Sequence, residues 1–242
     1  YKIIMNEIDT IIGKHAAIAA LQNPDRKILS LKCTKDFFEK NKGIIEDRKI
    51  LTFNIVKRKE IESEIGNNFH QGIIIKTKSL KKNDLGSIGN SEKMIVILDS
   101  LNDSQNVGSI LRTVYLFGIK TVIYNKDNSF AHNALLFKSA CGAFEKIKCI
   151  QVVNINRAIQ ILKDRGYWIL GLDLSSKSNL KNVPKDIKKA IVFGSESKGL
   201  RKFVIKNCDL TAKIELPVKD NLIDSLNVSN SVSIALYECL KE

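Results

Sequence analysis

Short apolar runs alternate with amphipathic stretches along most of this chain, which is the pattern of an α/β protein. In the first part, strands are predicted wherever an apolar run is bounded by turn residues, and helices wherever apolar residues recur at helical spacing. The predicted strands are ILSLKC (28–33), ILTFNIV (50–56) and GIIIKT (72–77), and the predicted helices are IIGKHAAIAAL (11–21), DFFEKNKGII (36–45) and RKEIESEI (58–65). Residues 1–78 are therefore predicted to form a small α/β domain.

The next stretch has no apolar period. Residues 79–93 are polar and rich in Gly, Ser and Asn, which is typical of a flexible linker.

A second α/β series follows and makes up residues 94–242. Its predicted strands are 94–99, 120–125, 167–174 and 189–194, with a further strand ending at Pro217, and its predicted helices are 106–118, 134–144, 155–166 and 226–242. Alternating strands and helices predict a mostly parallel sheet with helices on both faces. Ligands of such sheets bind where strands end and loops begin.

The chain is strongly basic. Among its 242 residues, 39 are Lys or Arg and 26 are Asp or Glu, which gives a formal net charge of +13. A surplus of this size favours a nucleic-acid partner, because Lys and Arg neutralise phosphates. The excess of lysine over arginine has a second explanation, since an A/T-rich genome produces it in any protein. The charge is spread over both halves of the chain.

Other classes of protein are disfavoured. The five cysteines form no C-x-x-C pair and the three histidines are scattered, so neither a disulfide framework nor a metal site is expected. No apolar run is long enough for a transmembrane helix, and the start of the chain does not resemble a signal peptide. We expect a soluble, cytoplasmic protein without a membrane partner.

Three loops of the second domain could carry chemistry. The first loop, within residues 99–113, follows a predicted buried strand and contains Asn106 and Arg112. The second is GSESKGL (194–200), with Gly194 and Glu196. The third precedes the last helix and contains Ser225 and Asn227. Each could also be no more than a well-capped helix start. The second loop departs from both common phosphate-binding patterns, because Glu196 replaces a glycine of the dinucleotide fingerprint and Leu200 replaces the P-loop lysine. A nicotinamide oxidoreductase is therefore disfavoured.

Taken together, the three loops resemble, in order and residue type, the three motifs of the SpoU (TrmH) class of RNA ribose 2′-O-methyltransferases. The stretches KSACGAFEKI and SLNVSNSVSIALYE resemble that class too, and IIGKHAAIAAL with HQGIII is similar to the small substrate-binding domain of the bacterial enzymes that methylate a guanosine ribose of large-subunit (23S) rRNA. One departure is Ser104, where members of the class usually have proline.

The resemblance implies a fold, a cofactor and an assembly. The fold is a SPOUT-type α/β domain whose parallel sheet is closed by a trefoil knot, preceded by a ribosomal L30e-like substrate-binding domain. The cofactor is S-adenosylmethionine, with Gly194, Ile214, Leu216 and Leu226 in its pocket. The enzymes of the class work as homodimers through the C-terminal domain.

The resemblance also implies site residues. The catalytic set is Asn106, Arg112, Glu196, Ser225 and Asn227. We expect Arg112 to bind the neighbouring phosphate and stabilise negative charge at the 2′-oxygen, because a guanidinium stays protonated and is a poor base. The proton acceptor is left open. In the first domain, Lys14, His15, His70 and Gln71 are candidate RNA contacts. Alternative functions are methylation of a tRNA ribose and a catalytically silent RNA-binding or ribosome-assembly protein.

Overall fold

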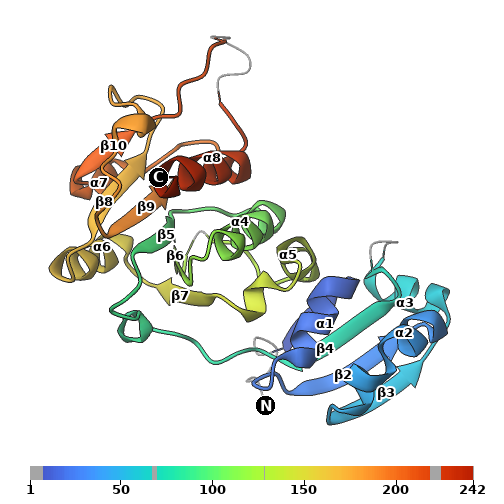
Figure 1. Ribbon diagram of the computed structural model, residues 1–242. Coiled ribbons are helices and arrows are strands. Elements are labelled where there is room, and N and C mark those ends of the chain that lie inside the picture. Colours follow the sequence, from blue (N-terminus) through green and yellow to red (C-terminus); the bar gives the residue numbers. More distant parts are fainter. Residues whose placement is uncertain (1–7, 67–69, 128, 219–224, 242) are drawn as a thin grey trace. The chain divides into compact units, whose positions relative to one another are not determined.

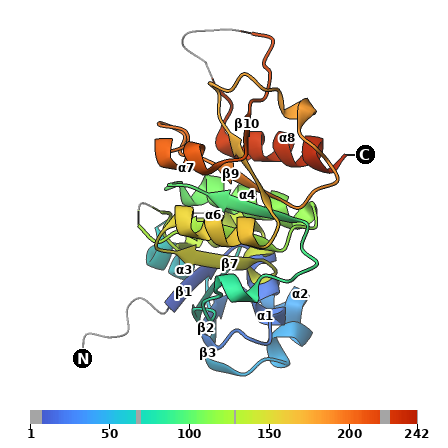
Figure 2. The same cartoon turned by 90° about the vertical axis from the view of Figure 1, so that its left-hand side faces the viewer.

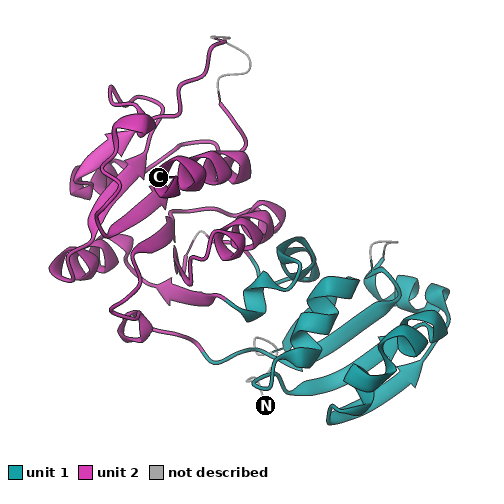
Figure 3. Ribbon diagram, in the orientation of Figure 1, with its two compact units in different colours: residues 1–81, 131–146 teal, residues 82–130, 147–242 magenta. Residues whose placement is uncertain are grey.

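The chain divides into two compact units, and one of them is built from two separate segments. In this computed structural model, residues 8–66, 70–127, 129–218 and 225–241 are described. Unit 1 consists of residues 1–81 and 131–146, and unit 2 of residues 82–130 and 147–242. Figure 3 shows the two units in different colours. The chain therefore passes from one unit to the other three times.

Unit 1 contains a mixed sheet. Within its described residues the strands are β1 (Ile8–Ile12), β2 (Ile28–Cys33), β3 (Ile50–Ile55) and β4 (Ile73–Lys78), and the helices are α1 (Lys14–Gln22), α2 (Lys35–Glu46), α3 (Arg58–Ile65) and α5 (Ala134–Ala140). The strand order is β1-β4-β2-β3; β4 is antiparallel to both its neighbours, and β2 is parallel to β3. The described residues between 8 and 78 form strands and helices, as predicted, but the compact unit also contains residues 131–146. Residues 11 and 12 were wrongly predicted as helical: they end β1, and Gly13, at φ 88°, turns the chain into α1.

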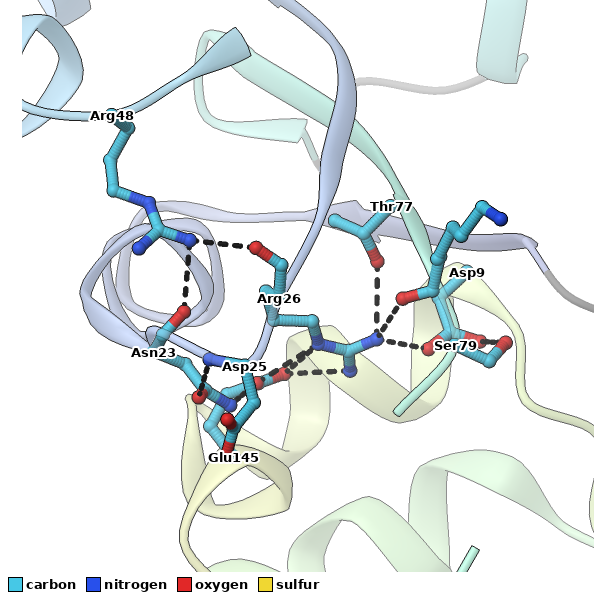
Figure 4. A network of polar contacts seen from close by, with 9 residues as sticks. Asp9, Asn23, Asp25, Arg26, Arg48, Thr77, Ser79 and Glu145 are labelled. Carbon is cyan, nitrogen blue, oxygen red and sulfur yellow. Dashed lines mark hydrogen bonds and ion pairs between the residues drawn. The ribbon is translucent and has the colours of Figure 1, made fainter. Parts of the chain in front are cut away.

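The second segment of unit 1 is held by a buried ion cluster. Residues 131–146 carry α5 and the short 3-10 helix η3 (Ala143–Glu145). Glu145 accepts hydrogen bonds from the Arg26 guanidinium at 2.8 to 3.1 Å, and Arg26 also pairs with Asp9 (Figure 4). Gly142 packs directly on α1, because a Cβ there would lie 2.6 Å from the Cβ of Ala19. Ionic and close backbone contacts together fasten this segment to the first one.

Unit 2 is built on a parallel sheet. The described strands are β5 (Met94–Leu98), β6 (Thr121–Asn125), β7 (Lys148–Val152), β8 (Trp168–Leu172), β9 (Lys189–Phe193) and β10 (Leu210–Ala212), and the helices are α4 (Ser104–Leu116), α6 (Ile155–Asp164), α7 (Lys202–Asn207) and α8 (Val228–Leu240). The strand order is β10-β8-β9-β5-β6-β7, and every pairing in it is parallel. Strands β5 and β9 at the centre are completely buried, as their apolar sequences predict.

Helices cover both faces of this sheet, as predicted. Helix α4 packs with α8, and α6 packs with α7 and with β8 (Figure 1). Figure 2 views unit 2 from the side of α6. Alternate residues of β5 face the two helical layers: Ile95 and Ile97 belong to the core that contains Ile159 of α6 and Val204 of α7. None of the described helices of the chain has the length and the apolar character that a membrane span requires.

Three elements of unit 2 were not predicted, and one prediction was wrong. Strand β7 is as long as its neighbours but contains the polar residues Lys148 and Gln151, which interrupt its apolar signal, and helix α7 and strand β10 span only six and three residues. A strand was expected to end at Pro217, but residues 214–216 are irregular and the sheet strand is β10, further back in the chain. The backbone of this irregular segment is therefore available to line a site.

The stretch 79–93, predicted as a linker, is structured over its second half. Ile88 is buried in the core of unit 2, and Lys148 donates to the carbonyl of Ser87 at 2.7 Å. Glu92 is buried and accepts from the Thr121 hydroxyl at 2.6 Å. Burial raises the pKa of the Glu92 carboxyl, but hydrogen bonds from Thr121, the Gly89 N–H and Lys148 outweigh it and lower the pKa below its ordinary value. Residues 85–93 therefore belong to the packed body of unit 2.

Candidate active site

The site forms at the carboxyl ends of the two central strands, β5 and β9. Asp99 follows β5 directly and is fully buried, and its carboxylate accepts from the Arg201 side chain, with Nε 3.1 Å from Oδ2 and Nη2 2.5 Å from Oδ1. Arg201 stands just after the loop that leaves β9. This two-pronged pair joins the beginning of the first candidate loop to the end of the second one.

The second loop, residues 194–200, folds back on itself. The N–H of Ser195 donates to the carbonyl of Gly199 at 3.1 Å, and the N–H of Gly199 donates back to the carbonyl of Ser195 at 2.8 Å. A Cβ on Gly194 would lie 2.2 Å from the Gly199 carbonyl carbon, so only glycine fits. Gly199 has a φ of 62°, which also favours glycine. Glycine is thus required at 194 by the backbone of the loop itself.

Three predicted catalytic residues meet at one point. The Asn106 amide Nδ2 donates to Glu196 Oε1 at 2.5 Å, and Asn227 Nδ2 donates to Asn106 Oδ1 at 3.0 Å and to Glu196 Oε1 at 3.4 Å. These residues lie in three different loops, and the structure brings their side chains together. All three are exposed or half-buried, so a ligand could reach the cluster.

The caps of two helices fix the orientation of the amides. Asn227 is the N-cap of α8, and its Oδ1 accepts from the Ser229 N–H at 2.9 Å, which leaves Nδ2 to face Asn106 and Glu196. Asp103 is the N-cap of α4, and its second oxygen accepts from Asn106 Nδ2 at 3.2 Å. Ser104 is the first residue of α4. Proline suits this position because the N–H that it lacks is not used by the helix, so serine in place of proline removes no functional group.

Two cavities adjoin the cluster. The larger, of about 360 Å³, is lined by residues 172–175, the 194–199 loop, residues 213, 214 and 216 and the start of the last helix. Of the predicted residues it contains Gly194, Glu196, Ile214, Leu216, Ser225 and Leu226. The smaller, of about 240 Å³, is lined by residues 100–103 and by Asn106. Ser195, Glu196, Ser197 and Val228 line both cavities. Glu196 therefore lies in the wall that the two cavities share.

Arg112 starts from another face of α4 than Asn106 does. It lies six positions after Asn106 on α4, and because each helical residue turns by about 100°, the two residues point about 120° apart around the helix. Arg112 is exposed and shares its face of α4 with the exposed Tyr115 and Leu116. The sequence motif therefore contains residues from two different faces of α4.

The candidate RNA residues of unit 1 lie around one pair of turns. Lys14, His15 and Gln71 are exposed, and the Lys14 N–H donates to Gln71 Oε1 at 2.8 Å. Gln71 has a φ of 52°, which is unusual for a residue other than glycine. His70 is fully buried, and its Nδ1 accepts from the Gly72 N–H at 3.0 Å, so this side chain supports the turn from inside.

Sequence reasoning missed several residues of these sites. Asp99 and Arg201 were not identified as a pair, although a carboxylate directly after a buried strand and an arginine directly after a glycine-bracketed loop are visible signals. Lys138 was also missed: a Cβ on Gly13 would lie 3.3 Å from its Cγ, so Lys138 lies beside the turn that carries Lys14. No spacing rule connects positions 13 and 138. Among the described residues, no group of His, Cys, Asp and Glu could hold a metal ion.

The fold and the site define an α/β protein with two adjoining cavities at the carboxyl edge of a parallel sheet. The model of the SpoU rRNA methylase family matches residues 93–237, and the chain belongs to this family.

Relatives match over nearly the whole chain. The 23S rRNA (guanosine-2′-O-)-methyltransferase RlmB of Coxiella burnetii is 30% identical, over 98% of this chain and 97% of the relative. A putative TrmH family tRNA/rRNA methyltransferase of Bacillus subtilis, YacO, is 28% identical, over 97% and 96%. The structure of an AdoMet-bound rRNA methyltransferase from Sinorhizobium meliloti superposes with a TM-score of 0.81 at 20% identity, covering 96% of this chain and 87% of that one.

Proposed function

We propose that this chain transfers a methyl group from S-adenosylmethionine to a ribose 2′-hydroxyl of RNA, and that its substrate is a guanosine of 23S rRNA. The observation that carries the proposal is the pair of adjoining cavities with a polar cluster in their shared wall. A methyl transfer needs two ligands whose reacting atoms meet, and two cavities separated by Glu196 provide this arrangement. The names of the relatives that match over the whole chain support rRNA as the substrate.

The larger cavity is the proposed cofactor site. Its volume of about 360 Å³ falls within the range of pockets for small ligands. Its walls combine apolar side chains, among them Ile214, Leu216 and Leu226, with serine hydroxyls and the backbone of the turn at Gly194. Such a lining suits a ligand with a flat apolar ring system and several polar groups. When bound, S-adenosylmethionine supplies an electrophilic methyl group on a positively charged sulfur.

The smaller cavity is the proposed ribose site. Asn106 lines it and is held by Asp103 and Glu196, so its amide can orient a sugar hydroxyl. Ser225 and Asn227 hold the start of the last helix and the substrate beside it. Arg112 binds the phosphate next to the reacting ribose and stabilises negative charge on the 2′-oxygen.

In a homodimer, Arg112 of one copy would serve the active site of the other copy. Because Arg112 and Asn106 lie on different faces of α4, the arginine is better placed to serve the site of a second copy than that of its own chain. The face of α4 that carries Arg112 also exposes Tyr115 and Leu116, and α8, which packs on α4, exposes Tyr237 and Leu240. Exposed apolar side chains on two neighbouring helices are typical of an interface. We therefore infer that α4 and α8 form the dimer surface.

The finer features of the fold are part of the same proposal. The segment 213–216 and residues 225–226 line one cavity with the 194–199 loop, and the chain then continues into α8, which packs on α4. This path is compatible with the trefoil knot of SPOUT domains. The four-stranded mixed sheet with its helices supports an L30e-like assignment for unit 1. The proposed ribosomal substrate supports a cytoplasmic location.

Unit 1 is the proposed RNA-recognition unit. Lys14, His15 and Gln71 offer exposed polar groups around a turn in which Gln71 itself has an unusual backbone conformation, and such conformations concentrate at functional sites. His70 supports this turn from inside, and Lys138 adds a further cation beside it. Contacts of this kind are ionic, so RNA affinity should fall steeply as salt rises.

The proposal is tested by methyl transfer from labelled cofactor to rRNA and tRNA of cells that lack the enzyme, followed by mapping of the modified nucleotide. We expect a 2′-O-methylguanosine in 23S rRNA. Arg112→Ala should lower the rate of methyl transfer by at least about a hundredfold, as loss of one oxyanion donor does, and leave cofactor affinity unchanged in calorimetry. Label in tRNA alone would establish the alternative substrate. If the wild-type protein showed no detectable cofactor binding or no detectable methyl transfer, the result would support the alternative of a catalytically silent RNA-binding protein.

A further inference from the structure

The helical layer formed by α6 and α7 carries an exposed aromatic side chain close to the proposed ribose site. Phe203 of α7 is 72% exposed. Two positions earlier, Arg201 pairs with Asp99, and the residue after Asp99 is Ser100, which lines the smaller cavity. Figures 1 and 2 both show α7 beside α6. The surface around Phe203 therefore begins next to the smaller cavity.

The backbone that carries Phe203 is held against α6. The Asn207 amide Nδ2 donates to the carbonyl of Phe203 at 2.8 Å and to Oδ1 of Asn156, in the first turn of α6, at 3.1 Å. The next residue, Val204, is fully buried in the core of unit 2. Phe203 thus projects from a fixed support, although so exposed a side chain adds little to the stability of its own chain.

The surroundings of Phe203 are cationic. The segments 153–163 and 197–208, which contain the first turns of both helices, include several Lys and Arg but no Asp or Glu. Among the described residues, Arg157, Lys202 and Lys206 form no ion pair. Asp209, just beyond the second segment, is paired with Lys163 at 2.7 Å. We call this region the α6–α7 surface, and its members besides Phe203 are Asn156, Arg157, Arg201, Lys202, Lys206 and Asn207.

Helix α2 of unit 1 is also rich in lysine, but its charges are compensated. Each lysine of α2 has a carboxylate of the same helix as its partner: Lys35 with Glu39 at 3.8 Å, Lys40 with Asp36 at 2.8 Å, and Lys42 with Glu46 at 3.7 Å. Such pairs cancel much of the positive field of a lysine-rich face. The α6–α7 surface has no such pairs for three of its cations among the described residues, so its field can attract a polyanion.

An aromatic ring among cations suits an unpaired stretch of nucleic acid. Lys206 Nζ lies over the Phe203 ring, 5.8 Å from its centroid, so a base stacked on this ring would have its phosphate close to a cation. Surfaces that bind single strands combine rings on which bases stack with cations that follow the backbone. A protein partner needs a larger apolar patch, whereas Phe203 is the one large apolar side chain of α7 that is exposed.

Resting on the proposed RNA substrate, we propose that an unpaired base close to the methylated nucleotide stacks on Phe203, while Lys202 and Lys206 bind the phosphates beside it. Stacking detects an unpaired base more than its identity, so this surface selects a target in a loop or bulge over one in a helix. Helices α6 and α7 cover the face of the sheet opposite α4 and α8. The surface therefore stays accessible in the proposed dimer.

Replacements at position 203 test the stack. Binding of a 23S rRNA transcript is measured by filter binding, with heparin as a competitor for purely ionic contacts. We expect Phe203→Ala to bind about 5- to 150-fold more weakly, which corresponds to the loss of one base–aromatic stack. Phe203→Trp should bind at least as tightly as wild type, whereas Phe203→Leu, which is apolar but has no ring, should resemble Phe203→Ala. Cofactor affinity should not change, because Phe203 lines neither cavity.

Trp168 supplies the matched control. It is an exposed aromatic residue of the same unit, at 49%, but it begins β8 and so lies at the amino edge of the sheet. Trp168→Ala should bind the transcript within about twofold of wild type, as expected for a surface substitution. Lys202→Gln and Lys206→Gln should each make the slope of log affinity against log salt shallower by about 0.7, whereas Phe203→Ala should leave that slope unchanged.

Methyl-transfer kinetics separate this role from a catalytic one. Phe203→Ala should raise the KM for RNA and leave kcat unchanged, since the ring touches none of the reacting atoms. Affinity of Phe203→Ala within about twofold of wild type would overturn the proposal, as would a Phe203→Leu protein that binds as tightly as Phe203→Trp. A wild-type protein that methylates no RNA would instead refute the proposed function, and the binding series would still decide the role of Phe203.

Discussion

Two polar clusters in this chain each join segments that lie far apart in the sequence, but water reaches only one of them. In unit 1, the side chains of Arg26, Asp9 and Glu145 are 0%, 3% and 2% exposed. In unit 2, Asn106, Glu196 and Asn227 are exposed or half-buried. The first cluster connects residues 119 positions apart and the second connects residues 90 and 121 positions apart. Sequence separation therefore does not distinguish them, whereas solvent access does.

The two clusters also differ in what remains unpaired. Every nitrogen of the Arg26 guanidinium donates to a partner, and Thr77 and the Lys78 carbonyl complete the set at 3.1 Å each (Figure 4). In the other cluster, Glu196 keeps one oxygen without a partner among the described residues. A saturated buried cluster can hold the fold but offers nothing to a ligand, whereas an open cluster can exchange partners with one. We infer that the first is structural and the second is chemical.

The largest expected effect comes from breaking the buried cluster. Arg26→Met should lower the free energy of unfolding of unit 1 by about 3–5 kcal/mol, because it leaves the carboxylates of Asp9 and Glu145 buried without a cation. The loss is measured by urea unfolding followed by circular dichroism, and by hydrogen exchange of peptides from α1 and α5. Lys40→Met is the matched control, since Lys40 and Asp36 form an exposed pair at 2.8 Å, and it should change stability by less than about 0.5 kcal/mol.

A further variant sharpens this test. If the loss comes from uncompensated charge, adding Asp9→Asn and Glu145→Gln to Arg26→Met should restore part of the stability. A triple variant less stable than Arg26→Met, or a loss below about 1 kcal/mol in Arg26→Met alone, would show that the cluster does not hold the second segment as we infer.

Much of the site could be predicted from the sequence because its parts are local. The apolar runs of β5 and β9 locate the strand ends, and Asn227 signals the start of α8 by its capping chemistry. The angular separation of Arg112 from Asn106 also follows from the sequence, because six helical residues turn by about 600°, which leaves the two side chains about 120° apart around the helix. The contact distances between the three loops were not predictable, because they depend on the parallel register of strands that are distant in the chain.

The placement of residues 131–146 in unit 1 was not predictable. Their sequence continues the α/β pattern of the second domain, and nothing in the spacing connects Glu145 with Arg26. The same limitation applies to residues 85–93, whose polar composition resembles a linker although Glu92 and Ile88 are buried. Deletion of residues 1–90 would consequently expose the face of α5 that packs within unit 1, and it would remove part of the core of unit 2.

The next largest effect concerns the pair that supports the open cluster. Asp99→Asn should lower the stability of unit 2 by about 1–2 kcal/mol, because it replaces a charge-assisted interaction with a neutral one while Arg201, whose side chain is 52% exposed, can be solvated. Trp168, the single tryptophan, lies in β8 of the same unit and reports its unfolding by fluorescence. Cofactor affinity should fall as well, since the pair fixes the 194–200 loop.

Arg201→Gln and Arg201→Lys form the matched set for this prediction. Glutamine removes the charge and the two-pronged geometry, whereas lysine keeps the charge only, so the loss should be larger for Gln than for Lys. Full cofactor affinity in Asp99→Asn would mean that the loop holds its shape through the Ser195–Gly199 hydrogen bonds alone.

The smallest expected effect is a pH dependence confined to unit 1. Burial, together with the positive charge of Arg58, lowers the pKa of His70 below 6.5, although Glu62 opposes this shift. The unfolded chain therefore binds a proton more readily than the folded one, and unit 1 should lose stability as pH falls through 6.5, by no more than about 1.4 kcal/mol per pH unit. His70→Asn keeps an acceptor for the Gly72 N–H but does not titrate, so its unfolding curves at pH 7.5 and 5.5 should lie closer together than those of wild type. An unchanged gap would assign the pH dependence to other groups.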